Sequence, residues 1–167
     1  DVSLARLDTQ VTKIKREIEL HKGSLAKNSK PGKLDLKYLD VVVTEICSLK
    51  CKDCSNLMQY YEKPQHTDLD VLLRSITRIM NCVDHLCEFR VIGGEPLVNK
   101  DVYKVIEKLT SFEKVDKVVI YTNATIIPKG DNLDCLRHEK IIFDISNYGP
   151  DSRKHDLLID TLKENNI

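Results

Sequence analysis

The sequence predicts an α/β fold in which parallel strands alternate with helices. Three observations lead to this prediction: four short runs rich in β-branched residues, amphipathic segments between them, and strands that read as nearly continuous apolar stretches. Helices that connect such strands cross over with a right hand. Ligands of parallel sheets bind beyond the carboxyl ends of the strands, so we expect the unusual residues of this chain to follow its strands directly.

The N-terminal segment is predicted to be a helix and linker at 1–34, ahead of a domain at 35–167. Apolar residues recur in it at spacings of three and four, which is typical of an amphipathic helix. These residues are Leu4, Leu7, Val11, Ile14 and Ile18. Gly23 is the expected end of this helix, which is too short for an independent coiled coil and is expected to pack on the domain.

Four strands and three helices are predicted to follow in alternation. The strands are expected at Tyr38–Thr44, Glu88–Ile92, Lys117–Thr122 and Lys140–Ser146. The helices are expected at Asp68–Val83, around Val102–Leu109 and around Leu157–Leu162. Thr67 is the expected N-cap of the first of these helices, because Asp70 stands three residues later.

Composition excludes several classes of protein. The 167 residues contain 26 Lys and Arg against 26 Asp and Glu, and the resulting net charge of zero argues against a general binder of nucleic acids or anionic membranes. No apolar run approaches the roughly 20 residues that span a bilayer. The charged N-terminal segment is not a secretory signal. We therefore expect a cytoplasmic protein with no nucleic-acid or membrane partner, and the first residue, Asp1 rather than Met, suggests an excised piece.

Three cysteines form a C-x3-C-x2-C array, CSLKCKDC, directly after the first predicted strand. Cys47, Cys51 and Cys54 bring together thiolates, which iron–sulfur clusters and zinc both prefer as ligands. Three thiolates leave one iron of a four-iron cluster without a protein ligand, whereas a structural zinc site needs a fourth ligand. A redox dithiol and a structural disulfide are further alternatives. The candidates for a fourth zinc ligand are His66, Cys82, His85 and Cys87.

Polar and glycine residues follow the other three strands, as expected of a site at the carboxyl edge of the sheet. Gly93, Gly94 and Glu95 follow the second strand, where paired glycines permit a close backbone approach and the carboxylate offers an acceptor for an ammonium group. Asn123 follows the third strand and Ser146 the fourth. The alternative for all of them is ordinary turn and cap chemistry.

These motifs resemble the radical S-adenosylmethionine (radical SAM) superfamily. CSLKCKDC after the first strand, IGGEPLVN after the second and YTNAT after the third match the marks of that superfamily in order, and the resemblance covers 36–167. It implies that Cys47, Cys51 and Cys54 bind three irons of a [4Fe-4S] cluster, while S-adenosylmethionine chelates the fourth. It also implies that Gly93, Gly94 and Glu95 hold the methionyl amino group. By the same resemblance, Asn123 and Ser146 contact the methionine carboxylate or the ribose.

The resemblance further implies a reaction and a partner. One electron, supplied by an external flavodoxin- or ferredoxin-like donor, would cleave S-adenosylmethionine to a 5′-deoxyadenosyl radical that abstracts hydrogen from an unknown substrate. The fold would be a partial (β/α) barrel with about four of six strand–helix units. Two alternatives stay open: a zinc-stabilised α/β binding module without redox chemistry, and a scaffold that keeps the cluster loop for structure alone.

Two expectations concern departures from the family pattern and the remaining cysteines. Asp53 stands before the third cysteine, where the family commonly has an aromatic or apolar residue near the adenine. Tyr60 and Tyr61 are candidates to replace that contact, with Asn147 and Tyr148 as others. Outside the array, three cysteines are predicted to be small buried hydrophobic residues. They are Cys82, Cys87 and Cys135.

Overall fold

The computed structural model describes residues 33–149 and 154–167. The predicted N-terminal helix lies outside these described residues. The chain divides into two compact units, Asp1–Asp35 and Leu36–Ile167, and the second unit contains the sheet.

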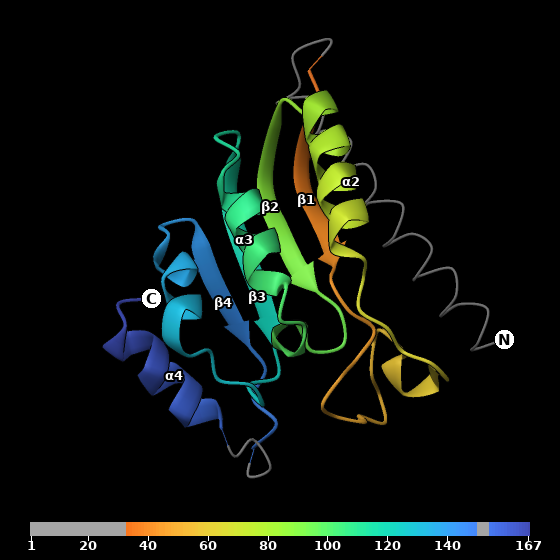
Figure 1. Cartoon of the computed structure of the whole chain (residues 1–167), viewed down its shortest axis with the longest axis vertical. Helices are drawn as coiled ribbons and strands as arrows, with labels where there is room; N and C mark the ends of the chain where they lie inside the picture. Colours follow the sequence, from red (N-terminus) through yellow and green to blue (C-terminus); the bar gives the residue numbers. More distant parts are fainter. Residues whose placement is uncertain (1–32, 150–153) are drawn as a thin grey trace, which may run out of the picture. The chain divides into compact units, whose positions relative to one another are not determined.

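Four strands form one sheet in the order β1-β2-β3-β4, and their arrowheads point to the same end (Figure 1). The strands are β1 Asp35–Val42, β2 His85–Ile92, β3 Val115–Thr122 and β4 Ile141–Ile145. The helices are α2 Leu69–Cys82, α3 Val102–Thr110 and α4 His155–Glu164, and the 3-10 turns are η1 Met58–Tyr60, η2 Pro96–Val98, η3 Gly130–Leu133 and η4 Cys135–Arg137. The predicted α/β fold with a parallel sheet is thereby confirmed.

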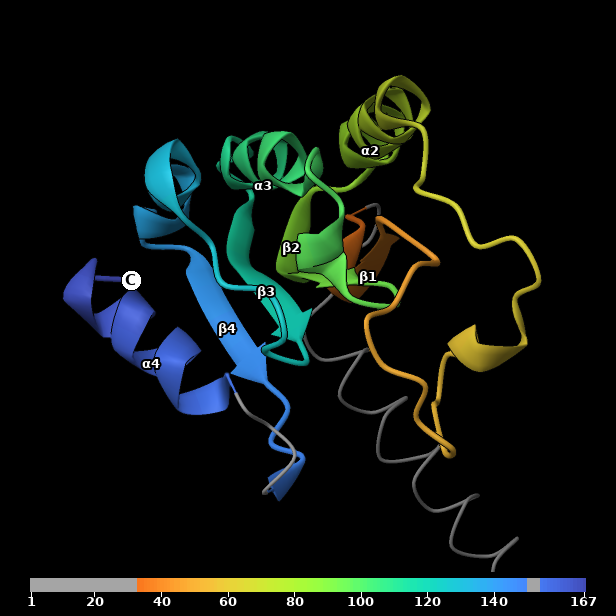
Figure 2. The ribbon, with the colours of Figure 1, turned by 60° about the horizontal axis from the view of Figure 1, so that its bottom comes forward.

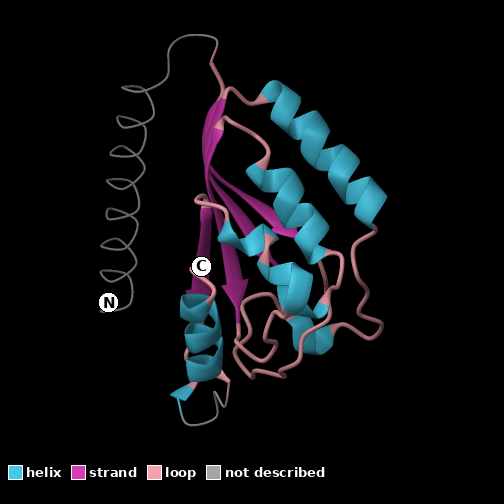
Figure 3. Ribbon diagram, turned by 60° about the vertical axis from the view of Figure 1, so that its left-hand side comes forward, coloured by secondary structure: helices cyan, strands magenta, loops and turns pink. Residues whose placement is uncertain are grey.

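Helices α2 and α3 cover the same face of the sheet (Figures 2 and 3). Phe89 and Val91 of β2 point to this face and are fully buried in a core that includes apolar residues of both helices, such as Met80 and Ile106. Alternate residues of an extended strand point to opposite faces, so the neighbours of these side chains form the second face. That face carries exposed side chains on the two outer strands, such as Tyr38, Val42 and Ile142.

The start of α2 differs by one residue from the sequence prediction. Asp68, not Thr67, is the N-cap, and its carboxylate accepts a hydrogen bond of 2.9 Å from the backbone N–H of Val71. Thr67 is instead paired with the end of β1, because its hydroxyl donates to the carbonyl of Val42 at 2.9 Å. Long-range pairing with a strand thus decides which of two good capping residues caps the helix.

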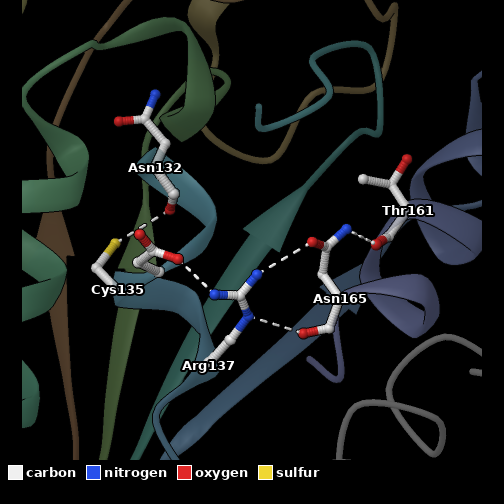
Figure 4. A network of polar contacts seen from close by, with 6 residues as sticks. Asn132, Cys135, Arg137, Thr161 and Asn165 are labelled. Atoms are coloured by element: carbon white, nitrogen blue, oxygen red, sulfur yellow. Dashed lines mark hydrogen bonds and ion pairs between the residues drawn. The ribbon is translucent and has the colours of Figure 1, made fainter. Parts of the chain in front are cut away.

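Helix α4 is attached to the segment before β4 by a side-chain network (Figure 4). The guanidinium of Arg137 donates to the backbone carbonyl of Asn165 at 3.0 Å and to its side-chain oxygen at 3.2 Å. Asn165 in turn donates to the carbonyl of Thr161 at 2.8 Å, and Arg137 also pairs with Asp134. Leu158 and Leu162 of α4 pack in a small apolar cluster that includes Phe143 and Ile145 of β4. Among the described residues, no helix has the length and apolar character that a membrane span requires.

Candidate functional site

The cysteine loop leaves β1 and returns to pair with its own beginning. Thr44 and His66 form an antiparallel bridge, and the N–H of Glu45 donates to the carbonyl of Gln65 at 2.9 Å. Thr44 is fully buried, and its hydroxyl lies 2.8 Å from His66 Nδ1 and accepts from the N–H of Ile46 at 3.0 Å. These bonds close the base of the loop that carries Cys47, and His66 is occupied within that base.

The two glycines after β2 bring that strand end against the start of the cysteine loop. The N–H of Gly94 donates to the carbonyl of Thr44 at 2.9 Å. A Cβ at Gly94 would lie 2.3 Å from the carbonyl oxygen of Ile46 and 2.8 Å from Cys47 Cβ, and a Cβ at Gly93 would lie 2.4 Å from the carbonyl oxygen of Thr44. Any larger residue would have to displace backbone, so the glycine pair fixes the position of Cys47.

Glu95 joins the ends of two strands. Its side chain is fully buried. Oε1 accepts from the hydroxyl of Thr122 at 2.8 Å and from the N–H of Leu97 at 3.1 Å, and Oε2 accepts from the N–H of Asn123 at 2.7 Å. Burial raises the pKa of this carboxyl, while the three hydrogen bonds oppose the rise. The predicted acceptor for an ammonium group is therefore already occupied by donors of the protein itself.

Asn123 connects the end of β3 with the first cysteine. Its Nδ2 lies 3.6 Å from Cys47 Sγ and 3.2 Å from the hydroxyl of Ser48, while its Oδ1 accepts from the N–H of Thr125 at 3.0 Å. Ala124 adopts a left-handed backbone with φ of 60°, which forms the tight turn that aims Asn123 at the loop. The amide is thus held on both sides and directs an N–H toward a thiol.

The surroundings of Cys47 change the acidity of its thiol. Burial raises the pKa of its thiol, and the negative charge of Glu95 adds to the rise. The N–H of Leu49 opposes it by donating to Sγ at 3.4 Å. Because metals bind the thiolate, a bound positive centre is what would stabilise the deprotonated form here.

One cavity of about 600 Å³ lies at the carboxyl edge of the sheet, and it brings together seven of the eight predicted site residues. Those seven are Cys47, Cys51, Cys54, Gly93, Gly94, Asn123 and Ser146. Glu95, the eighth, does not line the cavity and lies behind its wall, bonded to Thr122 and Asn123. Residues that lie far apart in the sequence therefore form one site.

The three thiols of the array line the same cavity. In a four-iron cluster each thiolate binds a different iron, which spreads the sulfurs around the cluster. Three thiols around one cavity are compatible with this arrangement.

The proposed fourth zinc ligands lie elsewhere in the fold. His85 and Cys87 stand at the beginning of β2, whereas the cysteine array follows the end of β1, at the opposite edge of the sheet. Cys82 is the last residue of α2, and His66 is bonded to Thr44. The prediction that the cysteines outside the array are buried is wrong for Cys82 and Cys87, which are exposed, and Cys135 is half-buried.

Several cavity residues were not foreseen from the sequence. Among the aromatic candidates that the sequence did offer, Tyr60 and Tyr61 are exposed and do not line the cavity, whereas Tyr148 does. Arg90 also lines it, and its Nε lies 2.5 Å from Asp40 with its guanidinium 4.0 Å above the ring of Tyr38. A charged residue inside the apolar run EFRVI was the signal for Arg90. No comparable signal distinguishes Asn56, whose amide donates to the carbonyl of Gly93 at 2.9 Å.

The fold and the site together define an α/β domain built to hold a thiolate-bound metal cofactor at its strand ends. Comparison with known proteins agrees. The family model described as "4Fe-4S single cluster domain" matches residues 38–146. The chain belongs to this family, and the curated relatives that follow agree with its identification as a member of the radical SAM superfamily.

The curated relatives include GTP 3′,8-cyclases. The enzyme of Alkaliphilus metalliredigens is 29% identical over 122 residues, which are 71% of this chain and 38% of the enzyme. The enzyme of Haemophilus ducreyi is 31% identical over 88 residues, which are 52% of this chain and 25% of the enzyme. The chain thus spans between a quarter and two fifths of the length of these relatives.

Two solved structures share the fold. Streptococcus suis SuiB bound to S-adenosylmethionine superposes with a TM-score of 0.59 at 21% identity, over 90% of this chain and 35% of that one. The protein anSMEcpe with bound AdoMet superposes with a TM-score of 0.57 at 21% identity, over 80% of this chain and 41% of that one. Both structures support the partial-barrel arrangement that the resemblance predicted.

Proposed function

We propose that this domain is the cofactor-binding part of a radical SAM enzyme. The observation that carries the proposal is the convergence of seven predicted residues on one cavity at the carboxyl edge of a parallel sheet. When bound, the cluster would supply the electron that cleaves S-adenosylmethionine to methionine and a 5′-deoxyadenosyl radical, which abstracts hydrogen from the substrate. The domains proposed are 1–34 as helix and linker and 35–167 as the core.

The residues of the chain would divide this work between them. Cys47, Cys51 and Cys54 would each bind one iron. Gly93 and Gly94 would present backbone to the methionyl amino group, because their side-chain-free surface lines the cavity while the carboxylate of Glu95 lies behind it. In this proposal Glu95 acts through the protein: it fixes the strand ends, and its buried negative charge favours a cationic amino group nearby.

Two further polar residues are placed to orient the cofactor. Asn123 lines the cavity beside Cys47 and Ser146 lines it after β4, so both would contact the methionine carboxylate or the ribose. Tyr148 is the aromatic residue proposed to pack against the adenine, in place of Tyr60 and Tyr61, which lie outside the cavity. Aromatic rings offer a flat apolar surface that suits a base.

The substrate and the partner belong to the same proposal. The substrate would bind over the second face of the sheet, opposite α2 and α3, where Arg90 and Tyr121 line the cavity together with the cysteines. The charge of Arg90 is balanced there by Asp40, so this region of the cavity wall is polar without a net charge. The electron donor would be an external flavodoxin- or ferredoxin-like protein, and the compartment the cytoplasm.

Anaerobic reconstitution of the full chain with iron and sulfide tests the proposal. We expect brown protein with about four irons and four sulfides per chain. Adding S-adenosylmethionine should change the electron paramagnetic resonance spectrum of the reduced cluster, and reductant should release methionine and 5′-deoxyadenosine. Cys51→Ala should lose iron, while Cys82→Ser, an exposed cysteine outside the cavity, should keep it.

Two results would contradict the proposal. Zinc bound to colourless protein that takes up no cluster would support the zinc-stabilised binding module instead. A full cluster that neither responds to S-adenosylmethionine nor cleaves it would support a scaffold in which the loop serves structure alone.

A further inference from the structure

A second group of metal-ligating side chains lies at the other edge of the sheet. His85 and Cys87 are two residues apart on β2 and flank Leu86, which is fully buried in the core. Residues two apart on a strand share a side, and neither side chain is buried: Cys87 is exposed and His85 is half-buried. The register pairs Leu86 with Val115 and Glu88 with Lys117, which sets Asp116 of β3 beside Cys87. Regular strand pairing thus places three different ligand types together.

The donor atoms of these residues are already close to coordination distance. His85 Nε2 lies 3.0 and 3.1 Å from the two carboxylate oxygens of Asp116. A ligand atom of each of the three residues lies within 4.8 Å of the others, which no other trio of His, Cys, Asp or Glu achieves in the described part of the chain. Ligands of one tetrahedral ion lie about 3.3–3.8 Å apart, so three ligand atoms within 4.8 Å of one another are near the spacing that such an ion requires.

The ligand types select a class of metal. An imidazole nitrogen, a thiolate and a carboxylate are a mixed set that suits zinc and neighbouring divalent transition ions, whereas magnesium and calcium prefer oxygen ligands alone. Three protein ligands leave a fourth position for water. The side chains of His85 and Asp116 are 36% and 53% exposed, so an ion can reach the group from solvent.

The group is separate from the cysteine array. Gly93 follows Cys87 by six positions along the chain, which at ~3.3 Å per strand residue is about 20 Å. The molecule also offers an internal comparison. In α4, His155 Nδ1 lies 3.2 Å from Asp156 Oδ1, but among the described residues this second histidine–aspartate pair belongs to no group of three metal-ligating side chains. The neighbouring thiol is therefore what distinguishes the group on the sheet.

We propose that His85, Cys87 and Asp116 form a binding site for a zinc-class divalent ion at the amino-terminal edge of the sheet. The ion would connect the first residues of β2 with the first residues of β3. This is the edge of the sheet opposite the proposed cluster site. Because the three ligands come together only in the folded chain, binding stabilises the fold. The site does not depend on the proposed function, since none of its ligands lines the cofactor cavity.

Cobalt(II) is the probe for the test, because thiolate ligation gives it intense absorption in the near ultraviolet and tetrahedral ligation gives it visible bands. The full chain with Cys47, Cys51 and Cys54 changed to Ala removes the competing thiols. We expect one saturable cobalt(II) site whose dissociation constant rises by about tenfold or more in each of the variants Cys87→Ser, His85→Ala and Asp116→Asn. Cys82→Ser and His155→Ala are the matched controls and should leave binding unchanged.

A second measurement covers the case in which the triple variant does not fold. The cluster-loaded chain is dialysed against zinc, and its zinc content and thermal unfolding midpoint are measured. We expect one zinc per chain in addition to the iron, and a zinc-dependent rise of the midpoint that Cys87→Ser abolishes. The proposal is overturned if zinc neither binds nor raises the midpoint, or if Cys87→Ser and Cys82→Ser behave alike.

Discussion

Two regions that meet at the cofactor cavity are built in opposite ways. The turns after β2 and β3 are buried, and Gly93, Glu95, Thr122, Asn123 and Ala124 all lie below the surface. The cysteine loop at 45–67 contains no buried residue, and Leu57 within it is 56% exposed. The polar groups of the turns are thus hydrogen-bonded within the protein. The loop, in contrast, is held at its base and at a few contacts, such as the hydrogen bond from Asn56 to Gly93.

This difference shows which part of the site exists before the cofactor arrives. Glu95 and its donors satisfy one another without any ligand, so the turns form a rigid wall. The loop has little apolar area to bury, so we expect its order to depend on what the thiols bind. We therefore expect changes to the wall to act through stability, and removal of the metal to act on the loop.

The largest effect is expected from removing the iron. Trypsin should then cut the loop at its exposed lysines Lys50 and Lys52 about tenfold faster or more, because the loop loses the ligand that orders it. Lys108 in α3 is the internal control and should be cut at the same slow rate in both forms. Mass spectrometry of timed digests measures this. Equal rates in the loop with and without iron would remove the distinction between loop and wall.

The next largest effect is expected from Gly94→Ala. The new Cβ would lie 2.3 Å from the carbonyl oxygen of Ile46 and would push the loop that carries Cys47. We expect a loss of about 3 kcal/mol in the free energy of unfolding, since overpacking against backbone cannot be relieved by a side-chain rotation. Iron binding on reconstitution should fall with it. Urea denaturation and iron analysis measure the two effects.

Gly130→Ala is the matched control for the glycine substitution. Gly130 has φ of +59°, and nothing lies within 4 Å of a Cβ added there. It should cost about 1 kcal/mol through backbone strain alone and leave iron binding intact. Equal iron binding by the Gly94→Ala and Gly130→Ala variants would contradict this prediction. It would show that the close approach of Gly94 to the backbone of Ile46 does not position Cys47.

A smaller and pH-dependent effect is expected from Glu95→Gln. Burial raises the pKa of Glu95 in the folded chain above its usual value, so the folded state keeps a proton that the unfolded state has lost. The free energy of unfolding should therefore fall as the pH rises from the usual carboxyl pKa through the raised one. Gln cannot titrate, so this pH-dependent fall should disappear. Its side-chain NH2 group would replace a carboxylate oxygen that accepts from an N–H or O–H donor, which should lower the free energy of unfolding by about 2 kcal/mol at low pH.

Unfolding of the metal-free chain between pH 4 and pH 8 measures this prediction. Glu113→Gln, on an exposed residue, is the control and should keep the pH dependence of the unchanged chain. If the fall with pH persisted in Glu95→Gln, the buried carboxyl of the wall would not be its origin.

The smallest effect is expected from Asn123→Ala, which changes the contact between wall and loop. The amide of Asn123 lies 3.6 Å from Cys47 Sγ, and hydrogen bonds to cluster sulfurs raise the reduction potential. The variant should therefore lower the midpoint potential of the cluster, as measured by a redox titration followed by electron paramagnetic resonance. Ser48→Ala keeps the bond to Cys47 and should leave the potential unchanged.

Much of the site could be predicted from the sequence because its chemistry is local. The spacing of Cys47, Cys51 and Cys54 in one loop indicates a shared ligand without knowledge of the fold. Strand ends could be located from apolar runs, so the polar residues that follow them, such as Asn123, could be assigned to one edge. The N-cap of α2 was missed by one residue because Thr67 pairs with Val42, a contact across 25 residues of chain.

What the sequence by itself determined is therefore the order of strands and helices, the thiol array and the edge at which the ligands gather. Only the tertiary structure decided that Glu95 faces its neighbours rather than the cavity, and that Arg90 and Tyr148 line the cavity instead of Tyr60 and Tyr61. The physical reason is that periodicity reports which face of an element is apolar. The direction of one polar side chain depends on which donors and acceptors the packing of distant segments brings beside it.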